Sequence, residues 1–96
     1  MTLGLPNNVE KYFETKVFTE KSLPEKITKK HNTKAGVWGR IVVLEGELDY
    51  IVSEPPKSLQ RLSPGIDGVI QPKQQHYVCV VGPVRFKIEF LKAPPN

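Results

Sequence analysis

Apolar and polar residues alternate along much of the chain, and the alternation is clearest between Gly36 and Val52. The first half of this stretch is mainly apolar, and its second half alternates with a period of two, as a half-buried strand requires. Within the second half, Leu48, Tyr50 and Val52 lie on one face, and Glu47 and Asp49 lie on the other. Glu45-Gly46 separates the two halves, and glycine readily adopts the positive φ of a hairpin turn. The pattern therefore predicts two strands joined by a tight turn.

Shorter strands are predicted on both sides of this hairpin. Val84–Leu91 gives the strongest pattern, because its apolar residues Val84, Phe86, Ile88 and Phe90 share one face. Weaker strand patterns, separated by turns such as Gly82-Pro83, cover part of Lys11–Phe18, Ser58–Leu62, Val69–Gln71 and His76–Val81. Ser22–Lys29 is expected to form a short helical turn capped by Ser22. Strands of this length and spacing are typical of an all-β barrel or sandwich.

Composition and charge narrow the class of protein. A chain of 96 residues that is 39% apolar and 25% charged suits one soluble globular domain. The net charge is +4, but the lysines of the first third have few aromatic residues among them, so no nucleic-acid partner is expected. The single cysteine, Cys79, excludes an intrachain disulfide and is expected to be a buried small hydrophobe. No apolar run reaches membrane-spanning length, so we expect a cytoplasmic protein without a membrane partner.

Three stretches of the chain resemble a known family: KVFTEKSLPEKI (Lys16–Ile27), HNTKAGVWGRIVVLEGELDY (His31–Tyr50) and QPKQQHYVCVVGPVRFKIEF (Gln71–Phe90). They are similar to the cupin-like family associated with tellurite resistance, which also occurs as the N-terminal part of some tellurite resistance B proteins. The resemblance implies one cupin-like domain over residues 1–96, a barrel of the double-stranded β-helix or jelly-roll type. It does not imply methyltransferase activity, because the chain lacks the Gly-rich strand-to-helix loop of a Rossmann-like domain.

The resemblance to cupins also directs attention to metal-binding residues. VVLEGEL resembles the end of the first cupin motif, but the usual ligand positions then fall on poor metal ligands, near Thr33, Ala35 and Gly39. His31 and His76 are the only histidines, and both fall where the comparison places the mouth or lumen of the barrel. Together with Glu89 they would suit a divalent transition metal, with zinc, iron, nickel and manganese left open.

Each of these residues also has a simpler interpretation. The two histidines are structural or surface residues in many proteins, and Glu89 is also read as a solvated residue on a half-exposed strand. Arg40 would bind an anionic ligand if its side chain pointed into the barrel, and is otherwise a surface arginine paired with a nearby glutamate. Trp38 either lines a ligand pocket or contributes to the core.

Three functions follow as hypotheses. The first is a binding module of a stress response to tellurite or other oxyanions, with a metal or small ligand held in the barrel. The second is a small metal-dependent enzyme of the dioxygenase or isomerase type. The third is a metal-free barrel that acts through protein partners, and a homodimer is expected in each case because so small a domain buries only a modest share of its surface. One fold hosts many functions, so the resemblance alone does not decide among them.

Overall fold

Six antiparallel strands form one sheet in the computed structural model, which describes residues 5–24, 27 and 33–94. The strands are β1 (Glu10–Glu14), β2 (Phe18–Thr19), β3 (Trp38–Val52), β4 (Ser58–Leu62), β5 (Gly68–Ile70) and β6 (His76–Lys92). The described residues contain no α-helix, so the prediction of an all-β protein is confirmed. Nor do they contain a helix of the length and apolarity needed to cross a membrane.

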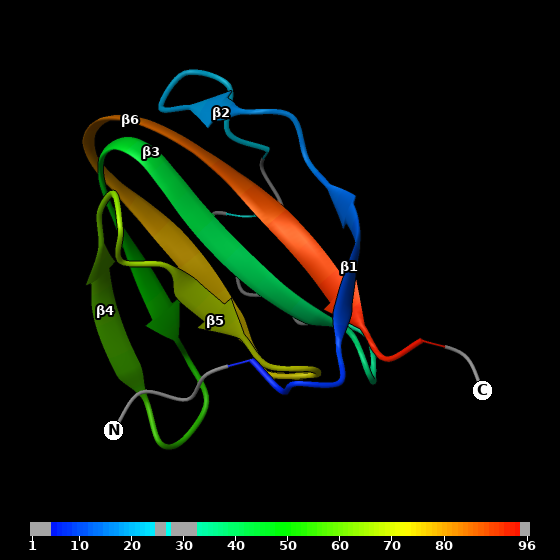
Figure 1. The fold of residues 1–96 in the computed structure, drawn as a ribbon. Helices are drawn as coiled ribbons and strands as arrows, with labels where there is room; N and C mark the ends of the chain where they lie inside the picture. Colours follow the sequence, from blue (N-terminus) through cyan, green and yellow to red (C-terminus); the bar gives the residue numbers. More distant parts are fainter. Residues whose placement is uncertain (1–4, 25–26, 28–32, 95–96) are drawn as a thin grey trace.

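Strands β3 and β6 make a two-stranded ribbon around which the other strands are arranged. They are 15 and 17 residues long, and they pair from Trp38 opposite Leu91 to Val52 opposite His76. Figure 1 shows the two strands arching together so that the ribbon bends back on itself. Strands β1 and β2 pair with the free edge of β6, and β4 and β5 pair with the free edge of β3.

The predicted hairpin at Glu45-Gly46 is wrong, because β3 runs through these residues without a turn. Gly46 lies opposite Val84 of β6, and the pairing register shifts on both sides of it. Its φ is 80°, and a Cβ at this position would lie 2.1 Å from the Pro83 carbonyl oxygen. A glycine with positive φ in a register shift is typical of a β-bulge, which bends a strand. The predicted turn at Gly82-Pro83 lies in the same bend, within β6.

The bend brings the apolar faces of the two halves of the ribbon together. We call this apolar side the inner face of the ribbon. Its buried residues include Ile41, Val43, Phe86 and Ile88 from one half and Leu48, Tyr50 and Val78 from the other. Strands β1 and β4 stand at the two ends of the strand order, and no pairing joins them in the described residues. The sheet is therefore open, and the closed cupin barrel is not shown.

The remaining strand predictions vary in accuracy. Ser58–Leu62 coincides with β4, and the apolar face expected for Val84, Phe86 and Ile88 is buried. The prediction of a buried Cys79 is wrong, because this residue lies exposed on the outer face of β6 between the buried Val78 and the half-buried Val80. The helical turn expected over Ser22–Lys29 falls largely outside the described residues, where only a hydrogen bond from the Ile27 amide to the Pro24 carbonyl (3.1 Å) marks a turn.

Candidate functional site

The largest hollow on the inner side of the sheet is a groove of about 560 Å³, which we call the inner groove. Its apolar lining includes Phe13, Phe18, Ile27, Val37, Ile88 and Phe90, and Thr33 and Lys34 add polar groups. These residues come from β1, β2, β6 and the segments between β2 and β3. Apolar hollows of this size with a few polar groups are typical of small-molecule sites.

Aromatic side chains dominate the open end of the inner groove. Phe13 is 56% exposed, and its ring centroid lies 6.2 Å from that of Phe90. Phe18 is buried, with its ring centroid 5.8 Å from that of Phe86 in the core. Large aromatic rings left at the rim of a hollow offer apolar contact area to a ligand at little cost in conformational entropy. Phe13 was not among the site residues predicted from the sequence. The adjacent aromatic residues Tyr12 and Phe13 on an expected edge strand could have indicated it.

A second, small cavity of about 30 Å³ adjoins the inner groove on the side of the core. This cavity shares Ile27, Thr33, Ile88 and Phe90 with the groove. Its other lining residues are Ile41, Ile70, His76 and Val78. The buried His76 therefore lines a cavity that adjoins the groove and does not line the groove itself.

His76 is held beside this cavity by the backbone of its own loop. Only 2% of the residue is exposed, and its Nδ1 lies 2.7 Å from the Gln74 carbonyl oxygen. A carbonyl oxygen only accepts hydrogen bonds, so Nδ1 carries the hydrogen and donates it. The imidazole is thereby fixed in orientation, and its ring centroid lies 5.7 Å from that of Tyr50.

Glu89, the predicted carboxylate ligand, lies in a cluster of charged side chains instead. Arg40 of β3 stands opposite it and donates a hydrogen bond from Nε to Glu89 Oε1 (3.0 Å). Lys87 Nζ and Lys11 Nζ lie 3.5 and 3.8 Å from Glu89 Oε2. Burial raises the pKa of Glu89, but the Arg40 hydrogen bond and the three positive charges outweigh it and hold the pKa below its usual range. In this structure Arg40 is thus paired with a glutamate, and ligand binding by Arg40 stays a prediction.

The predicted site residues are not brought together among the residues that the structure describes. Glu89 follows Ile88 in β6, so its side chain points to the face opposite Ile88 and His76, which line one cavity. Trp38 precedes Arg40 by two residues in β3, so it shares the Arg40 face and lies away from the inner groove. His31 lies outside the described residues. Among those that are described, no group of three or more His, Cys, Asp or Glu is arranged to hold a metal ion.

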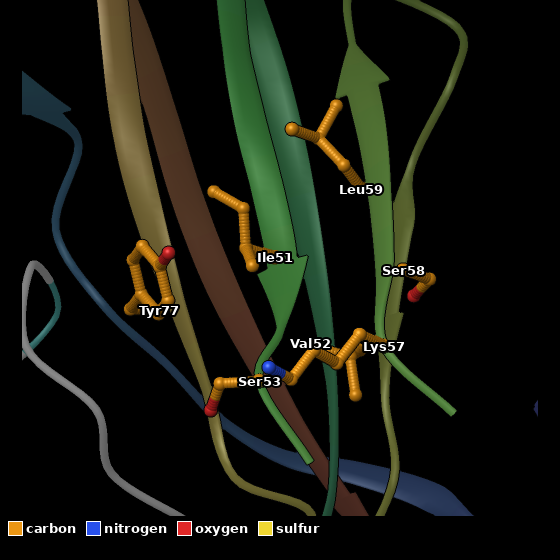
Figure 2. A pocket seen from close by; sticks show the side chains of 7 residues that line it. All are labelled: Ile51, Val52, Ser53, Lys57, Ser58, Leu59 and Tyr77. Atoms are coloured by element: carbon orange, nitrogen blue, oxygen red, sulfur yellow. The ribbon is translucent and has the colours of Figure 1, made fainter. Parts of the chain in front are cut away.

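A second hollow lies on the outer face of the other half of the ribbon (Figure 2), and we call it the outer pocket. It measures about 390 Å³ and is lined by Ile51, Val52, Ser53, Lys57, Ser58, Leu59 and Tyr77. Ile51 stands opposite Leu59 in β4 and opposite Tyr77 in β6, so these three side chains form one row across three strands. Figure 2 shows these three side chains on neighbouring strands, with Ser53 and Lys57 below them in the view.

Comparison with known proteins relates this fold to one family. Residues 14–88 match the family model described as the TehB-like domain. Over 46 residues the chain is 39% identical to the probable S-adenosyl-L-methionine-dependent methyltransferase TehB of Haemophilus influenzae (strain ATCC 51907 / DSM 11121 / KW20 / Rd), covering 48% of this chain and 16% of that protein. The resemblance to tellurite resistance B proteins is thereby supported, whereas none of these matches shows a cupin.

Two solved structures share the fold. The crystal structure of TehB from Haemophilus influenzae superposes with a TM-score of 0.83 and 25% identity, over 91% of this chain and 32% of that one. The crystal structure of a protein from Escherichia coli strain K12 superposes with a TM-score of 0.87 and 22% identity, over 98% of this chain and all of that one. The chain thus spans about a third of the solved TehB chain, and the same fold makes up the whole of the second structure.

Proposed function

Because the chain belongs to the TehB-like domain family, we propose that it is a binding module of a tellurite or oxyanion stress response and holds a small, mainly apolar molecule in the inner groove. The observation that supports this most is the groove itself, which is lined by aromatic rings and adjoins the small cavity beside the buried His76. A hollow that extends from the surface toward the core encloses most of a small ligand, which a shallow surface depression does not.

Lys34 refines the class of ligand that we propose. It is the one basic residue among the described lining of the inner groove, and it lies on an exposed segment at the entrance to β3. An apolar molecule with a weakly anionic group would match both the aromatic rings and this ammonium group. An oxyanion without an apolar body would leave the aromatic lining unused.

We do not extend the methyltransferase activity named for TehB to this chain. The match covers only 16% of that protein, and the Gly-rich strand-to-helix loop that such chemistry uses is absent from the sequence. In the longer relatives we propose that this fold binds a ligand while another region of the chain carries out methyl transfer. For the chain itself we propose a cytoplasmic location.

Binding of an apolar anionic dye, 8-anilinonaphthalene-1-sulfonate, tests the proposed function. We expect the folded protein to bind it saturably, and Phe13→Ser to weaken binding about fivefold or more because the exposed ring at the groove rim is lost. Leu59→Ser is the matched control, since it removes an exposed apolar side chain from the outer pocket. Equal dye binding by both variants, with unchanged thermal unfolding, would overturn the assignment to the inner groove.

The metal site at His31, His76 and Glu89 stays a prediction. The pairing of Glu89 with Arg40 does not favour the carboxylate as a ligand, and a metal-dependent enzyme is therefore our second choice of function. Metal analysis of protein purified without chelator decides the matter. Stoichiometric metal that is lost in His76→Ala would favour that second choice.

A second copy of the chain is the partner that we propose for the outer pocket. Strand β4 pairs only with β3, so the backbone groups along its other edge have no strand partner in the described residues. Leu59 on this strand is 65% exposed and continues the apolar row of Ile51 and Tyr77 up to the edge. An open edge next to apolar side chains favours pairing with another strand. Two β4 strands running antiparallel about a twofold axis would extend the sheet and cover Leu59 in both copies.

A further inference from the structure

Four residues form the wall that the inner groove shares with the small cavity, and we call them the partition. They are Ile27, Thr33, Ile88 and Phe90, each of which lines both hollows. The cavity measures about 30 Å³, whereas a single water molecule needs about 10–15 Å³ on the same kind of measure. It therefore has room for one or two heavy atoms. The partition thus ends the groove just short of additional buried space.

Phe90 is the member of the partition that can change with the least effect on the rest of the fold. Ile27 and Ile88 belong to the buried core cluster. Thr33 fixes the chain before β3, because its hydroxyl donates a hydrogen bond to the Gln71 carbonyl oxygen (2.9 Å). Phe90 is only half-buried and packs against the core cluster from outside it. A substitution of Phe90 therefore alters the partition more than the core.

The neighbours of Phe90 in the sheet indicate what its ring fills. On one side Phe90 stands opposite Phe13 of β1, with the ring centroids 6.2 Å apart, and on the other side opposite Gly39 of β3. Glycine has no side chain, so β3 offers nothing at this point that could take the place of the ring. Beyond Gly39, Ile70 of β5 already lines the small cavity. Loss of the ring would therefore leave open space between the groove and the cavity.

We propose that Phe90 sets the depth of the inner groove and thereby the length of the ligand that the groove accepts. The ligand class is a straight-chain amphipathic anion, with its charged group near Lys34 and its chain along the aromatic lining as far as Phe90. With a smaller residue in place of Phe90, the chain would extend into the small cavity, where His76 lies. This inference rests on the proposed function, and it adds the residue by which the groove selects among apolar chains.

A series of straight-chain carboxylates from butanoate to dodecanoate measures this depth through displacement of 8-anilinonaphthalene-1-sulfonate. Each methylene group that leaves water strengthens binding about fourfold, so the affinity should rise with chain length and stop rising once the chain reaches Phe90. In Phe90→Ala we expect the rise to continue for about two or more further methylene groups, because the cavity adds to the space that the ring leaves. The ring signals of His76 in NMR spectra should shift with these longer chains in the variant and not in the wild type.

Phe13→Ala is the matched control, because it removes the same ring from the groove at a residue that does not line the small cavity. It should weaken the binding of every chain and leave unchanged the length at which the affinity stops rising. If Phe90→Ala does not fold, Phe90→Leu removes less volume and should move that length by about one methylene group.

The outcomes separate this inference from the proposed function. An unchanged length limit in the folded Phe90 variant, or an equal shift of the limit in Phe13→Ala, would overturn the role of Phe90 and leave the groove as the binding site. Dye binding by the wild type that no carboxylate displaces would do the same. Absence of dye binding to the wild type would overturn the proposed function and this inference together.

Discussion

The inner groove and the outer pocket lie on opposite faces of the same ribbon, yet they differ in size and in the elements that line them. The inner groove is lined by residues from β1, β2, β6 and the segments before β3, and it adjoins a small cavity that His76 lines in the core. The outer pocket is bordered by three neighbouring strands of a single layer, and Leu59 at its edge is 65% exposed. The second side of the inner groove comes from the segments between β2 and β3, which contribute Pro24, Ile27, Thr33, Lys34 and Val37 to its lining. This difference is the basis on which we propose different partners for the two faces, a small molecule for the inner groove and a second copy of the chain for the outer pocket.

The bend at Gly46 is the feature on which this contrast depends most, and we expect Gly46→Ala to have the largest effect on stability. The methyl group would meet the Pro83 carbonyl oxygen, and alanine is strained at a φ of 80°. The expected loss is about 3–5 kcal/mol in the free energy of unfolding. Urea denaturation measures it, and dye binding should disappear with the fold of the inner groove.

Gly65 provides the control for this prediction. Its φ is 89°, but nothing lies within 4 Å of a Cβ at that position. Gly65→Ala therefore tests the backbone strain alone, which costs about 1–2 kcal/mol. Equal losses in the two variants would show that contact with Pro83 is unimportant and that the bend tolerates a side chain.

The charged cluster at Glu89 also differs from the outer pocket. Both lie on the outer face of the ribbon, but the half that carries Glu89 bears ion pairs, whereas the other half bears an apolar row. Glu89→Gln leaves Arg40 with a neutral partner, and we expect a loss of about 1–2 kcal/mol at pH 7. The folded pKa of Glu89 lies below its unfolded value, near 4.3, so the stabilisation is present above that value and is lost as the pH falls through the folded pKa. The difference between wild type and variant should therefore shrink from pH 5 toward pH 3 in urea denaturation.

Glu45→Gln is the matched control for the cluster. Glu45 pairs with Arg85 at 3.1 Å, but its side chain is 67% exposed, so little change in stability is expected. A difference between wild type and Glu89→Gln that stays constant down to pH 3 would contradict the role of the ionised carboxylate. A loss in Glu45→Gln as large as in Glu89→Gln would show that burial of the pair has no influence.

The strands could be predicted from the sequence, but the continuity of β3 through Gly46 could not. Ser58–Leu62 and the buried face of Val84, Phe86 and Ile88 follow from a period of two, which is local information. A glycine with positive φ serves both a hairpin turn and a β-bulge, so Gly46 looks the same in either. What distinguishes the two is the partner strand, because Gly46 lies opposite Val84, far away in the sequence. No pattern within Gly36–Val52 contains that information.

The candidate site was harder to predict for a related reason. The sequence singles out His76, and the structure places it in the lining of a small cavity beside the groove, but its neighbours there come from distant strands. The cross-strand pairing of Arg40 with Glu89 likewise depends on the register between β3 and β6. Phe90 could not be distinguished from an ordinary core phenylalanine, because its place between two hollows is a property of the packed structure. The family resemblance supplied the TehB-like relationship but not the location of the hollow.

The smallest change in stability is expected from a substitution at one surface residue, Leu59, which tests whether the outer face pairs two copies of the chain. Leu59→Lys places a charge in the apolar row next to the edge of β4, so it should disfavour pairing of two copies while altering the free energy of unfolding of the monomer little. We expect the wild type to sediment as a dimer at micromolar concentration and Leu59→Lys as a monomer. Phe13→Ser, which alters the inner groove, should remain a dimer and lose dye binding, and Leu59→Lys should do the reverse. A wild-type chain that sediments as a monomer would refute the dimer, and two variants that behave alike in both measurements would refute the division of roles between the faces.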